Sequence, residues 1–399
     1  MNENMDRRKF LKITGGAGSA LGAGLALGTP IWSQDVKNET PPARPKTNID
    51  DVLKIPRTQY SLPGLFPGSV VEINDPKAMT EKGISADIVN AMIQKGITTL
   101  TGKNMKESFS LLFKPDDIVG IKVNPVGAGF ISTRLEVVDA VIAWLRQGGI
   151  PAENIVIWDR FEYMLKNAGF TEERYPGIRL VGLQTMDEDF VEGKTTDTSK
   201  WMDRSNGFHR SFHNFDTDTY YFADVDGPKD PPYLCQHVVN GKYSYFGKLL
   251  TQTLTKIINI PVFKNTGNGI SMATKNMGYG AICNTGRLHK PIFFDVCTEV
   301  LAFPAIRDKM VLNITDGLRG QYDGGPEPNA QFTYLYNTLF FATDPFALDM
   351  TCHNILVNKR KEMKVKSLNE HPRFSEYLRY AERLGLGIAD PKKIKHVRA

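Results

Sequence analysis

Five apolar segments in the sequence are each followed by a charged or amide residue, and such residues bind anions and transfer protons. In an open parallel α/β sheet, ligands bind beyond the carboxyl ends of the strands, so residues in these positions share one edge. One polar residue after a strand is typical of an ordinary loop, but five together predict a site. The five positions are Lys122 with Asn124, Asp159 with Arg160, Lys264 with Asn265, Asp316, and Asp344.

Glycines and basic residues occupy the same loops, which predicts a site for a carboxylate or a phosphate. Glycine lets backbone amides approach a ligand closely, and Lys and Arg neutralise the charge of the ligand. We expect Lys122, Lys264 and Lys275 to hold the anion, with Asn124 and Asn276 orienting it. The predicted ligand-binding set is Lys122, Asn124, Arg160, Lys275, Asn276, Gly324, Gly325 and Asp344.

Three residues are candidates for catalytic proton transfer: His289, Asp316 and Lys264. His289 lies in the same part of the sequence as Lys275 and Arg287, and an ordinary histidine pKa suits proton transfer near neutral pH. Each candidate also has a structural interpretation. His289 is then a buried core residue, and Lys264 and Asp316 neutralise each other and join two loops.

The sequence argues against the common cofactors and polymer partners. The four cysteines are scattered without a Cys-x-x-Cys pair, so no iron–sulfur cluster is expected. Gly127-Ala128-Gly129 lacks the third glycine of a dinucleotide fingerprint, so no nucleotide cofactor is expected. A net charge of +5 without a long basic run indicates no nucleic-acid partner. No metal site is predicted, because His209 and His213 lie in loop-like sequence; oxygen ligands for a hard cation are nevertheless offered by Asp316, Asp323, Asp344 and Asp349.

The elements that must position these residues alternate between strands and helices. Residues 118–123 read as a buried strand, 135–146 as an amphipathic helix and 155–158 as the next strand. This order is typical of a parallel sheet with right-handed crossovers. Further strands are predicted at 257–263, 310–315 and 339–343, and helices at 84–95, 293–303 and 345–357. The predicted fold class is α/β, with a parallel-rich sheet, helices on both faces and an inserted aromatic cap.

Residues 61–399 are interpreted as one α/β domain with an insertion. The core covers about residues 110–170 and 250–357, and a C-terminal helix covers about residues 374–384. The insertion, about residues 171–247, is aromatic, polar and irregular. Asn240-Gly241 between the short segments 236–239 and 242–246 predicts a two-residue β-hairpin within it.

The first 34 residues have the layout of a signal peptide. Arg7-Arg8 with the following Phe10-Leu11-Lys12 resembles the twin-arginine export motif, and an uncharged Gly- and Ala-rich stretch comes next. We expect the twin-arginine translocation machinery as a partner and the bacterial periplasm as the destination. Membrane attachment is expected only through an uncleaved signal. Residues 35–60 are predicted to form a linker and a surface arm.

Several strings between residues 110 and 357 resemble, in order and spacing, the family catalogued as domain of unknown function 362. The most specific are Lys275-Asn276-Met277-Gly278 and Asp344-Pro345-Phe346-Ala347-Leu348-Asp349. Many members of that family carry iron–sulfur cysteine motifs, which this chain lacks, and the family name supplies no reaction. A weaker likeness, at 132–134 and 149–155, is to the N-terminal domain of nickel-pincer lactate racemases, without their Gly-Thr-His motif.

The sequence therefore predicts an exported enzyme that acts on a small anionic substrate at the strand-end loops. The alternative is a non-catalytic periplasmic ligand-binding or assembly-factor module that uses the same residues. Perturbed acid–base groups in the site would favour the enzyme.

Overall fold

The computed structural model describes residues 44–184, 210–226, 237–239, 241–267, 269–289, 292–365 and 373–399. The predicted signal peptide and the first part of the predicted linker lie outside these residues, as do His209 and Cys235.

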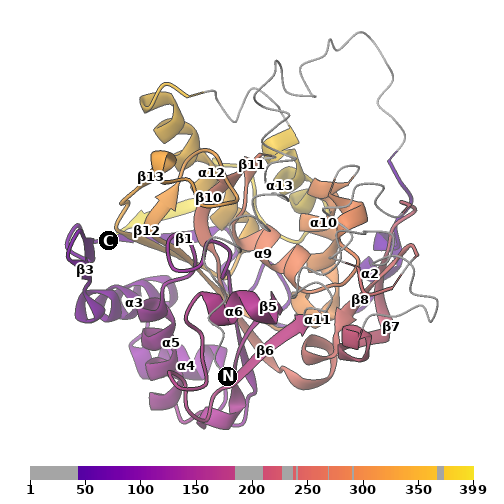
Figure 1. Cartoon of the computed structure of the whole chain (residues 1–399), viewed down its shortest axis with the longest axis horizontal. Helices are drawn as coiled ribbons and strands as arrows, with labels where there is room; N and C mark the ends of the chain where they lie inside the picture. The colour runs from indigo at the N-terminus through magenta and orange to yellow at the C-terminus, as the bar shows by residue number, and fades with distance from the viewer. Residues whose placement is uncertain are drawn as a thin grey trace, which may run out of the picture.

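One large sheet organises the described residues (Figure 1). Its main path runs in the order β15–β1–β14–β12–β9–β4–β5–β6. Strands β12, β9, β4, β5 and β6 are parallel neighbours, and on this path β14 runs antiparallel to the strands on both sides of it. The strands are β1 (Ser69–Asn74), β4 (Val119–Val123), β5 (Ile155–Phe161), β6 (Arg179–Gln184), β9 (Lys256–Ile260), β12 (Met310–Gln321), β14 (Thr338–Ala342) and β15 (Lys395–Arg398).

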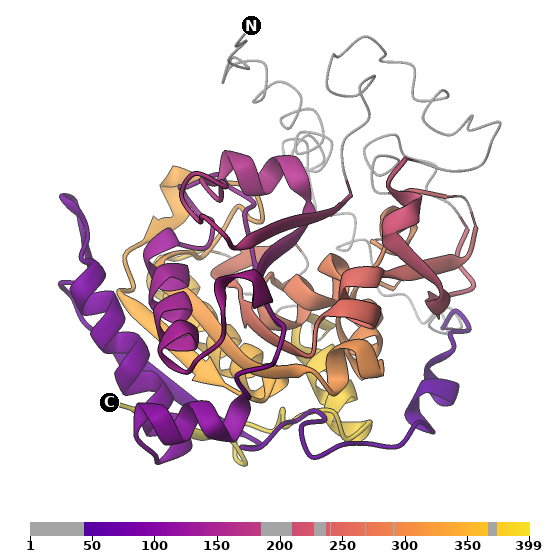
Figure 2. The same ribbon diagram turned by 90° about the horizontal axis from the view of Figure 1, so that it is seen from below.

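Side chains alternate between the two faces of the sheet along each strand, and helices cover both faces. Val119, Ile121 and Val123 of β4 face a core shared with α3 (Ala86–Thr101), α4 (Met105–Leu112) and α5 (Leu135–Gln147). On the other face lie α9 (Ala273–Gly280), α10 (Phe293–Glu299), α12 (Pro345–Glu362) and α13 (Arg373–Arg383). Figures 1 and 2 show the sheet between these two groups of helices. The predicted α/β class with helices on both faces is confirmed.

Local sequence signals fix where several helices begin. The Ser85 side chain accepts a hydrogen bond at the start of α3. Asn104 and Glu107 form a capping box at the start of α4. Asp344 caps α12, and Pro345 occupies the first turn, where its missing N–H has no intrahelical partner to lose. The starts of α3, α4 and α12 are therefore fixed by capping residues next to them in the sequence.

Three predicted strands differ from the structure in ways that move predicted site residues. The segment predicted at 310–315 continues as β12 to Gln321, because β10 (Val262–Thr266) and β13 (Thr333–Tyr334) extend its pairing, so Asp316 lies within a strand. The segment predicted at 257–263 is two strands, β9 and β10, which break at Pro261 because proline has no N–H for the ladder. Lys264 therefore lies inside β10. Since β14 is antiparallel to β12, Asp344 lies at the opposite edge from the carboxyl ends of β9 and β4.

The region of the predicted insertion contains a separate two-stranded sheet. Strand β7 (Phe215–Phe222) pairs antiparallel with β8 (Tyr243–Gly247). Strand β8 covers most of the second segment of the hairpin predicted around Asn240-Gly241, and the predicted hairpin itself includes Gln236 and Asn240, which lie outside the described residues. Tyr221 of β7 and Phe246 of β8 are buried in one hydrophobic cluster, and this shared apolar face explains the pairing.

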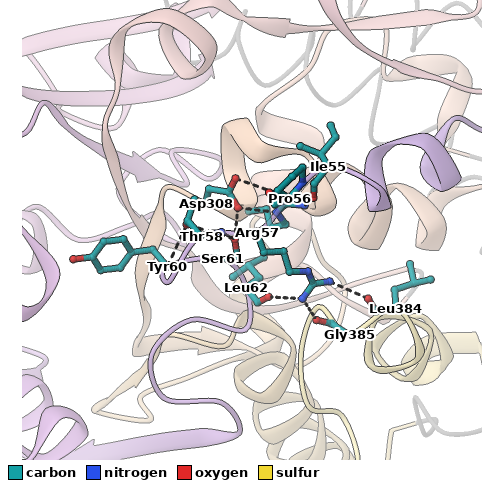
Figure 3. Close-up of polar contacts among 11 residues, drawn as sticks. Ile55, Pro56, Arg57, Thr58, Tyr60, Ser61, Leu62, Asp308, Leu384 and Gly385 are labelled. Carbon is teal, nitrogen blue, oxygen red and sulfur yellow. Dashed lines mark hydrogen bonds and ion pairs between the residues drawn. The ribbon is translucent and has the colours of Figure 1, made fainter.

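Residues 55–62, at the end of the predicted arm, are bound tightly to the body of the fold (Figure 3). The fully buried Arg307 side chain donates to the Asp308 carboxylate and to the carbonyl oxygens of Ile55 and Pro56. Ser61 donates a further hydrogen bond to Asp308. The arm is therefore attached beside the amino end of β12 rather than lying free on the surface.

Arg57 joins the same arm to the end of α13 (Figure 3). Its guanidinium donates to the carbonyl oxygens of Leu62, Leu384 and Gly385. These carbonyls include the unpaired ones at a helix carboxyl end, which a cation satisfies well. We refer to Arg57, Ser61, Arg307 and Asp308 as the arm clamp.

We expect Arg307→Met to lower the free energy of unfolding by about 3 kcal/mol, because it leaves the Asp308 carboxylate and two arm carbonyls without their main donor. Urea denaturation at neutral pH measures the change. The matched control is Lys54→Met, which removes an exposed ion pair with Asp51 and should leave the denaturation midpoint unchanged. Identical unfolding of Arg307→Met and the wild type would show that the arm clamp does not stabilise the fold.

Candidate functional site

Lys122 is buried near the carboxyl end of β4, on the face covered by α9. Its Nζ donates to Asp159 Oδ1 at 2.6 Å, to Val123 O at 2.7 Å and to Asn276 Oδ1 at 2.9 Å. Burial lowers the pKa of Lys122, and the Asp159 carboxylate opposes that shift. All three ammonium protons have acceptors, so Lys122 joins β4, β5 and α9 through a buried ion pair.

Gly280 provides the space that this lysine needs. A Cβ at Gly280 would lie 2.4 Å from Lys122 Cε and 3.0 Å from its Nζ. In a close-packed interior such a carbon would displace the ammonium or lift the helix. The glycine therefore allows α9 to pack directly over the lysine.

A chain of buried asparagines continues from Lys122 across the sheet. Asn276 Nδ2 donates to Asn259 Oδ1 at 2.8 Å, and Asn259 Nδ2 donates to Asn313 Oδ1 at 2.9 Å and to Ala273 O at 3.1 Å. Asn313 in turn donates to carbonyl oxygens at the end of β14. A buried amide is costly unless it is hydrogen-bonded, and these amides are. The chain holds the Asn276 oxygen toward Lys122.

Lys264 is fully buried in β10 beside the loop that follows β4. Its Nζ donates only to neutral oxygens: Asn124 Oδ1 at 3.3 Å, Val126 O at 3.2 Å and Ile131 O at 3.5 Å. Burial lowers the pKa of Lys264 to about 7, although the charge of Glu327 opposes the shift. Within the described residues this ammonium contacts no carboxylate, so its charge is not neutralised by an ion pair.

Lys275 lies on α9 among aromatic rings. Its Nζ is 5.6 Å from the ring centre of Tyr279 and 5.8 Å from that of Phe293. The side chain is partly buried, and in the described part of the chain it makes no hydrogen bond or ion pair. Burial lowers the pKa of Lys275; the charges of Cys297 and Glu327 oppose this and the charge of Lys122 adds to it.

Lys122, Lys264 and Lys275 form what we call the lysine cluster. The charges of Lys275 and Lys122 both lower the pKa of Lys264, so the three ammonium groups lie within electrostatic range of one another. Among the described residues, Asp159 is the carboxylate that contacts the cluster. The predicted convergence of these lysines and Asn276 is thus present in the structure.

His289 packs beside the cluster as part of the aromatic group. Its ring centre is 4.5 Å from that of Tyr279, and its Nδ1 lies 2.9 Å from Thr285 O. Burial, together with the positive charge of Lys275, lowers the pKa of His289 to about 3. The imidazole is therefore neutral near pH 7, and the expectation of an ordinary histidine pKa is corrected.

Two predicted acidic site residues have structural partners instead. Asp316 accepts hydrogen bonds from the N–H groups of Arg134 at 2.8 Å and Leu318 at 3.1 Å, which fixes the start of α5. Its contacts are separate from those of Lys264, so the proposed Lys264–Asp316 pair is not formed. Asp344 caps α12 and also accepts from the N–H of Ile388, at the edge away from the lysines.

The remaining predicted ligand-binding residues shape the loops around the cluster. Arg160 donates to Gln184 and to the carbonyl oxygens of Tyr279 and Ile282, so it holds the end of α9 to β5 and β6. Gly325 N donates to Asn265 Oδ1 at 3.0 Å, and a Cβ at Gly325 would lie 2.2 Å from Asn265 O. Gly324 has a φ of +68°, which glycine adopts without strain. Asn124 accepts the hydrogen bond from Lys264.

Metal ligands are not gathered in the described residues: no group of three or more His, Cys, Asp or Glu is placed to hold an ion. Of the aspartates considered as cation ligands, Asp323 pairs with Arg360 at 2.5 Å. Asp349, predicted to be internal to a helix, lies in α12 and accepts hydrogen bonds from the first N–H groups of α9. The described cysteines, Cys283, Cys297 and Cys352, are buried free thiols.

Sequence reasoning missed the asparagine chain and the rings beside Lys275. The signal for Asn259 and Asn313 was present, since each is a single amide within a run of apolar residues, at 257–260 and 310–314, where a buried polar group needs a partner. Tyr279 and Phe293 carried no such signal, because aromatic residues at helical positions are typical of a core.

The fold and these contacts define an α/β protein with a buried lysine cluster beside one helix of its sheet. Residues 119–354 match the family described as DUF362, a domain of unknown function. This match covers more than half of the chain, and the chain belongs to that family. No curated protein and no solved structure shows significant similarity to the chain. The likeness to lactate racemases stays a prediction.

We expect Lys264→Met to change the pH dependence of stability in a defined direction. The folded pKa of Lys264, about 7, is below the ordinary lysine value of 10.5, so the unfolded chain binds a proton that the folded chain does not between these values. Stability associated with Lys264 is therefore lost as the pH falls from about 10 to about 7. As the pH falls from about 10 to about 7, the free energy of unfolding of the variant should therefore rise relative to that of the wild type.

Urea denaturation at about pH 7 and pH 10 measures this difference. Loss of the hydrogen bonds to Asn124, Val126 and Ile131 changes the free energy of unfolding by a similar amount at both pH values. The difference between the two pH values therefore isolates the contribution of the Lys264 proton. Lys103→Met, at an exposed lysine, is the matched control and should follow the wild type. A pH-independent difference for Lys264→Met would contradict the low pKa.

Proposed function

We propose that the protein is an enzyme that binds a small anionic substrate at the lysine cluster. The observation that carries the proposal is Lys275, a partly buried amine that has no hydrogen bond or ion pair in the described residues and has two further lysines nearby. Removing an ammonium from water without a counter-charge is unfavourable. A bound oxyanion would remove this penalty.

The hydrogen bonds within the cluster suggest how the three lysines share the ligand. Lys122 has all its protons on protein acceptors, the shortest being to Asp159, so it contributes charge rather than a direct contact. Lys264 makes three long contacts, from 3.2 to 3.5 Å, to neutral oxygens. Lys275 retains its donors and is the lysine that touches the anion in this proposal. Carboxylates and phosphates both offer the oxyanion that it requires.

The perturbed groups around the cluster support an enzyme over a simple binding protein. A pKa of about 7 suits Lys264 for accepting and returning a proton near neutral pH. Neutral His289 is suited to hydrogen bonding rather than to acid catalysis. Groups whose pKa values are shifted by burial and by neighbouring charges gather at functional sites. A lysine whose pKa is lowered to about 7 supports an enzyme more than a non-catalytic binding or assembly module.

We expect a small oxyanion to raise the melting temperature of the wild type and not of Lys275→Met. The probes are propionate and inorganic phosphate, each compared with sodium chloride at the same ionic strength. An anion that binds only the folded state stabilises by RT ln(1 + [L]/Kd), which is about 2.7 kcal/mol at a hundred times Kd. The anion that raises the melting temperature identifies the ligand as a carboxylate or a phosphate.

The matched control is Lys106→Met, at an exposed lysine away from the cluster, which should retain the full response. Lys275→Arg keeps the positive charge and should retain most of it. An equal response in Lys275→Met, or the absence of a response to both anions in the wild type, would refute anion binding at the cluster.

We further propose that the protein is exported through the twin-arginine route. The support is in the sequence, in Arg7-Arg8 and the weakly apolar stretch that follows. The described residues contain no helix of the length and apolar character needed to cross a membrane.

Replacing Arg7 and Arg8 together by lysine should leave folded protein in the cytoplasm, because the twin-arginine machinery reads the arginine pair. Cell fractionation followed by immunoblotting measures the distribution. Replacement of Lys12 by Arg keeps the pair and is the control. Normal delivery of the double variant, or a loss of delivery only when the Sec route is blocked, would refute the proposal.

A further inference from the structure

We propose that Lys275 is a nucleophile that forms an imine with its substrate, and that the substrate class is a small carboxylate carrying an adjacent aldehyde or ketone. The inference rests on the proposed anion site and adds the reacting atom to it. It follows from the surroundings of the Lys275 amine, which differ from those of the other two lysines in the cluster.

Accessibility selects Lys275 among the three. Lys264 and Lys122 are 0% and 1% exposed, and each directs three hydrogen bonds to protein oxygens. Lys275 is partly exposed and faces the rings of Tyr279 and Phe293 rather than an acceptor. An amine with no acceptor to hold its protons is the one whose lone pair can reach a carbonyl carbon.

The environment also favours the neutral, nucleophilic form of Lys275. The neighbouring rings of Tyr279 and Phe293 replace water on one side of the amine, and the Lys122 ammonium lies within electrostatic range. Apolar surroundings and a neighbouring cation both activate lysines for imine formation. An ordinary exposed lysine is neutral in only about one molecule in 2,500 at pH 7, so the lowered pKa of Lys275 increases the fraction of this amine that carries a free lone pair.

The positive charge of the cluster accounts for the carboxylate in the proposed substrate class. The charge of Lys122 is offset by its ion pair with Asp159, whereas the ammonium of Lys264 contacts no carboxylate in the described residues. Protonated Lys264 therefore attracts the carboxylate of the substrate toward Lys275 and continues to do so after the neutral amine of Lys275 has reacted. A substrate with both groups therefore uses the whole cluster.

The covalent step balances without any further reactant. The Nζ lone pair forms a bond to the carbonyl carbon, and the carbonyl π electrons move to the oxygen, which takes up a proton. The resulting carbinolamine loses its hydroxyl group as water after that oxygen gains a second proton, and nitrogen keeps one proton in the iminium ion. Because Lys275 is partly exposed, solvent can supply and accept these protons.

Borohydride trapping tests the inference directly. Full-length purified protein is incubated near pH 7 with pyruvate and sodium cyanoborohydride, and intact mass spectrometry with peptide mapping locates any adduct. One adduct per chain is expected at Lys275, with a mass increase equal to pyruvic acid less one oxygen atom. Lys275→Arg, which keeps the charge but has no nucleophilic amine near pH 7, should show none. Lys106→Met should label like the wild type.

Propionate, which has no carbonyl next to its carboxylate, separates this inference from the proposed function. If propionate raises the melting temperature of the wild type but pyruvate gives no adduct at Lys275, the anion site is retained and the imine is overturned. Labelling spread over surface lysines, or retained in a folded Lys275→Arg variant, would overturn it equally. A neutral aldehyde that labels Lys275 as fast as pyruvate does would overturn the role of the carboxylate.

Discussion

The ion pair of Lys122 with Asp159 is the interaction on which the rest of the site depends. One ammonium bonds to its own strand, to β5 and to Asn276 of α9, so three elements meet at a single nitrogen. A buried ion pair is not a large source of stability, because the desolvation of both charges offsets most of their attraction. Removing one partner is costly, however, and that cost fixes the geometry. Gly280 is the corresponding constraint on the helix, since any side chain there would occupy the position of the lysine.

Helix α9 is held at its amino end by a second buried carboxylate. Asp349 of α12 accepts the N–H groups of Ala273 and Thr274 and the hydroxyl of Thr274. Burial raises the pKa of Asp349 to about 6, while these hydrogen bonds favour the charged form. An anion at a helix amino end also meets the positive end of the helix dipole. With Asp349 at its start and Lys122 beneath it, the helix presents Lys275 and Tyr279 in one orientation, which a site with little tolerance for misplacement requires.

Prediction from the sequence succeeded where one local rule decides the outcome and failed where pairing between distant segments decides it. The strand and helix at 119–147 follow from hydrophobic periodicity and were located within a residue or two. The direction of β14 was not accessible in this way, because an apolar run of five residues reads the same in a parallel or an antiparallel sheet, and Asp344 was therefore assigned to the wrong edge. Lys264 was predicted as a site residue because it follows an apolar run, although it lies inside strand β10. The pKa of His289 could not be predicted, since it depends on burial and on a lysine fourteen positions away.

The distribution of lysine and arginine separates structural cations from the lysine cluster. Arg307 in the arm clamp and Arg160 beside α9 each use several donors to bind carbonyl oxygens or carboxylates, and a guanidinium keeps its proton in any protein environment. Arginine suits a position that needs only a permanent cation with several hydrogen bonds. Lysine differs because burial can remove its proton within the range of physiological pH. Lys264 makes three long contacts to neutral oxygens in the loop after β4, and burial lowers its pKa to about 7. Its surroundings favour a group that changes its protonation state over one that only holds the loop, which supports the proposal of chemistry, rather than binding alone, at the lysine cluster.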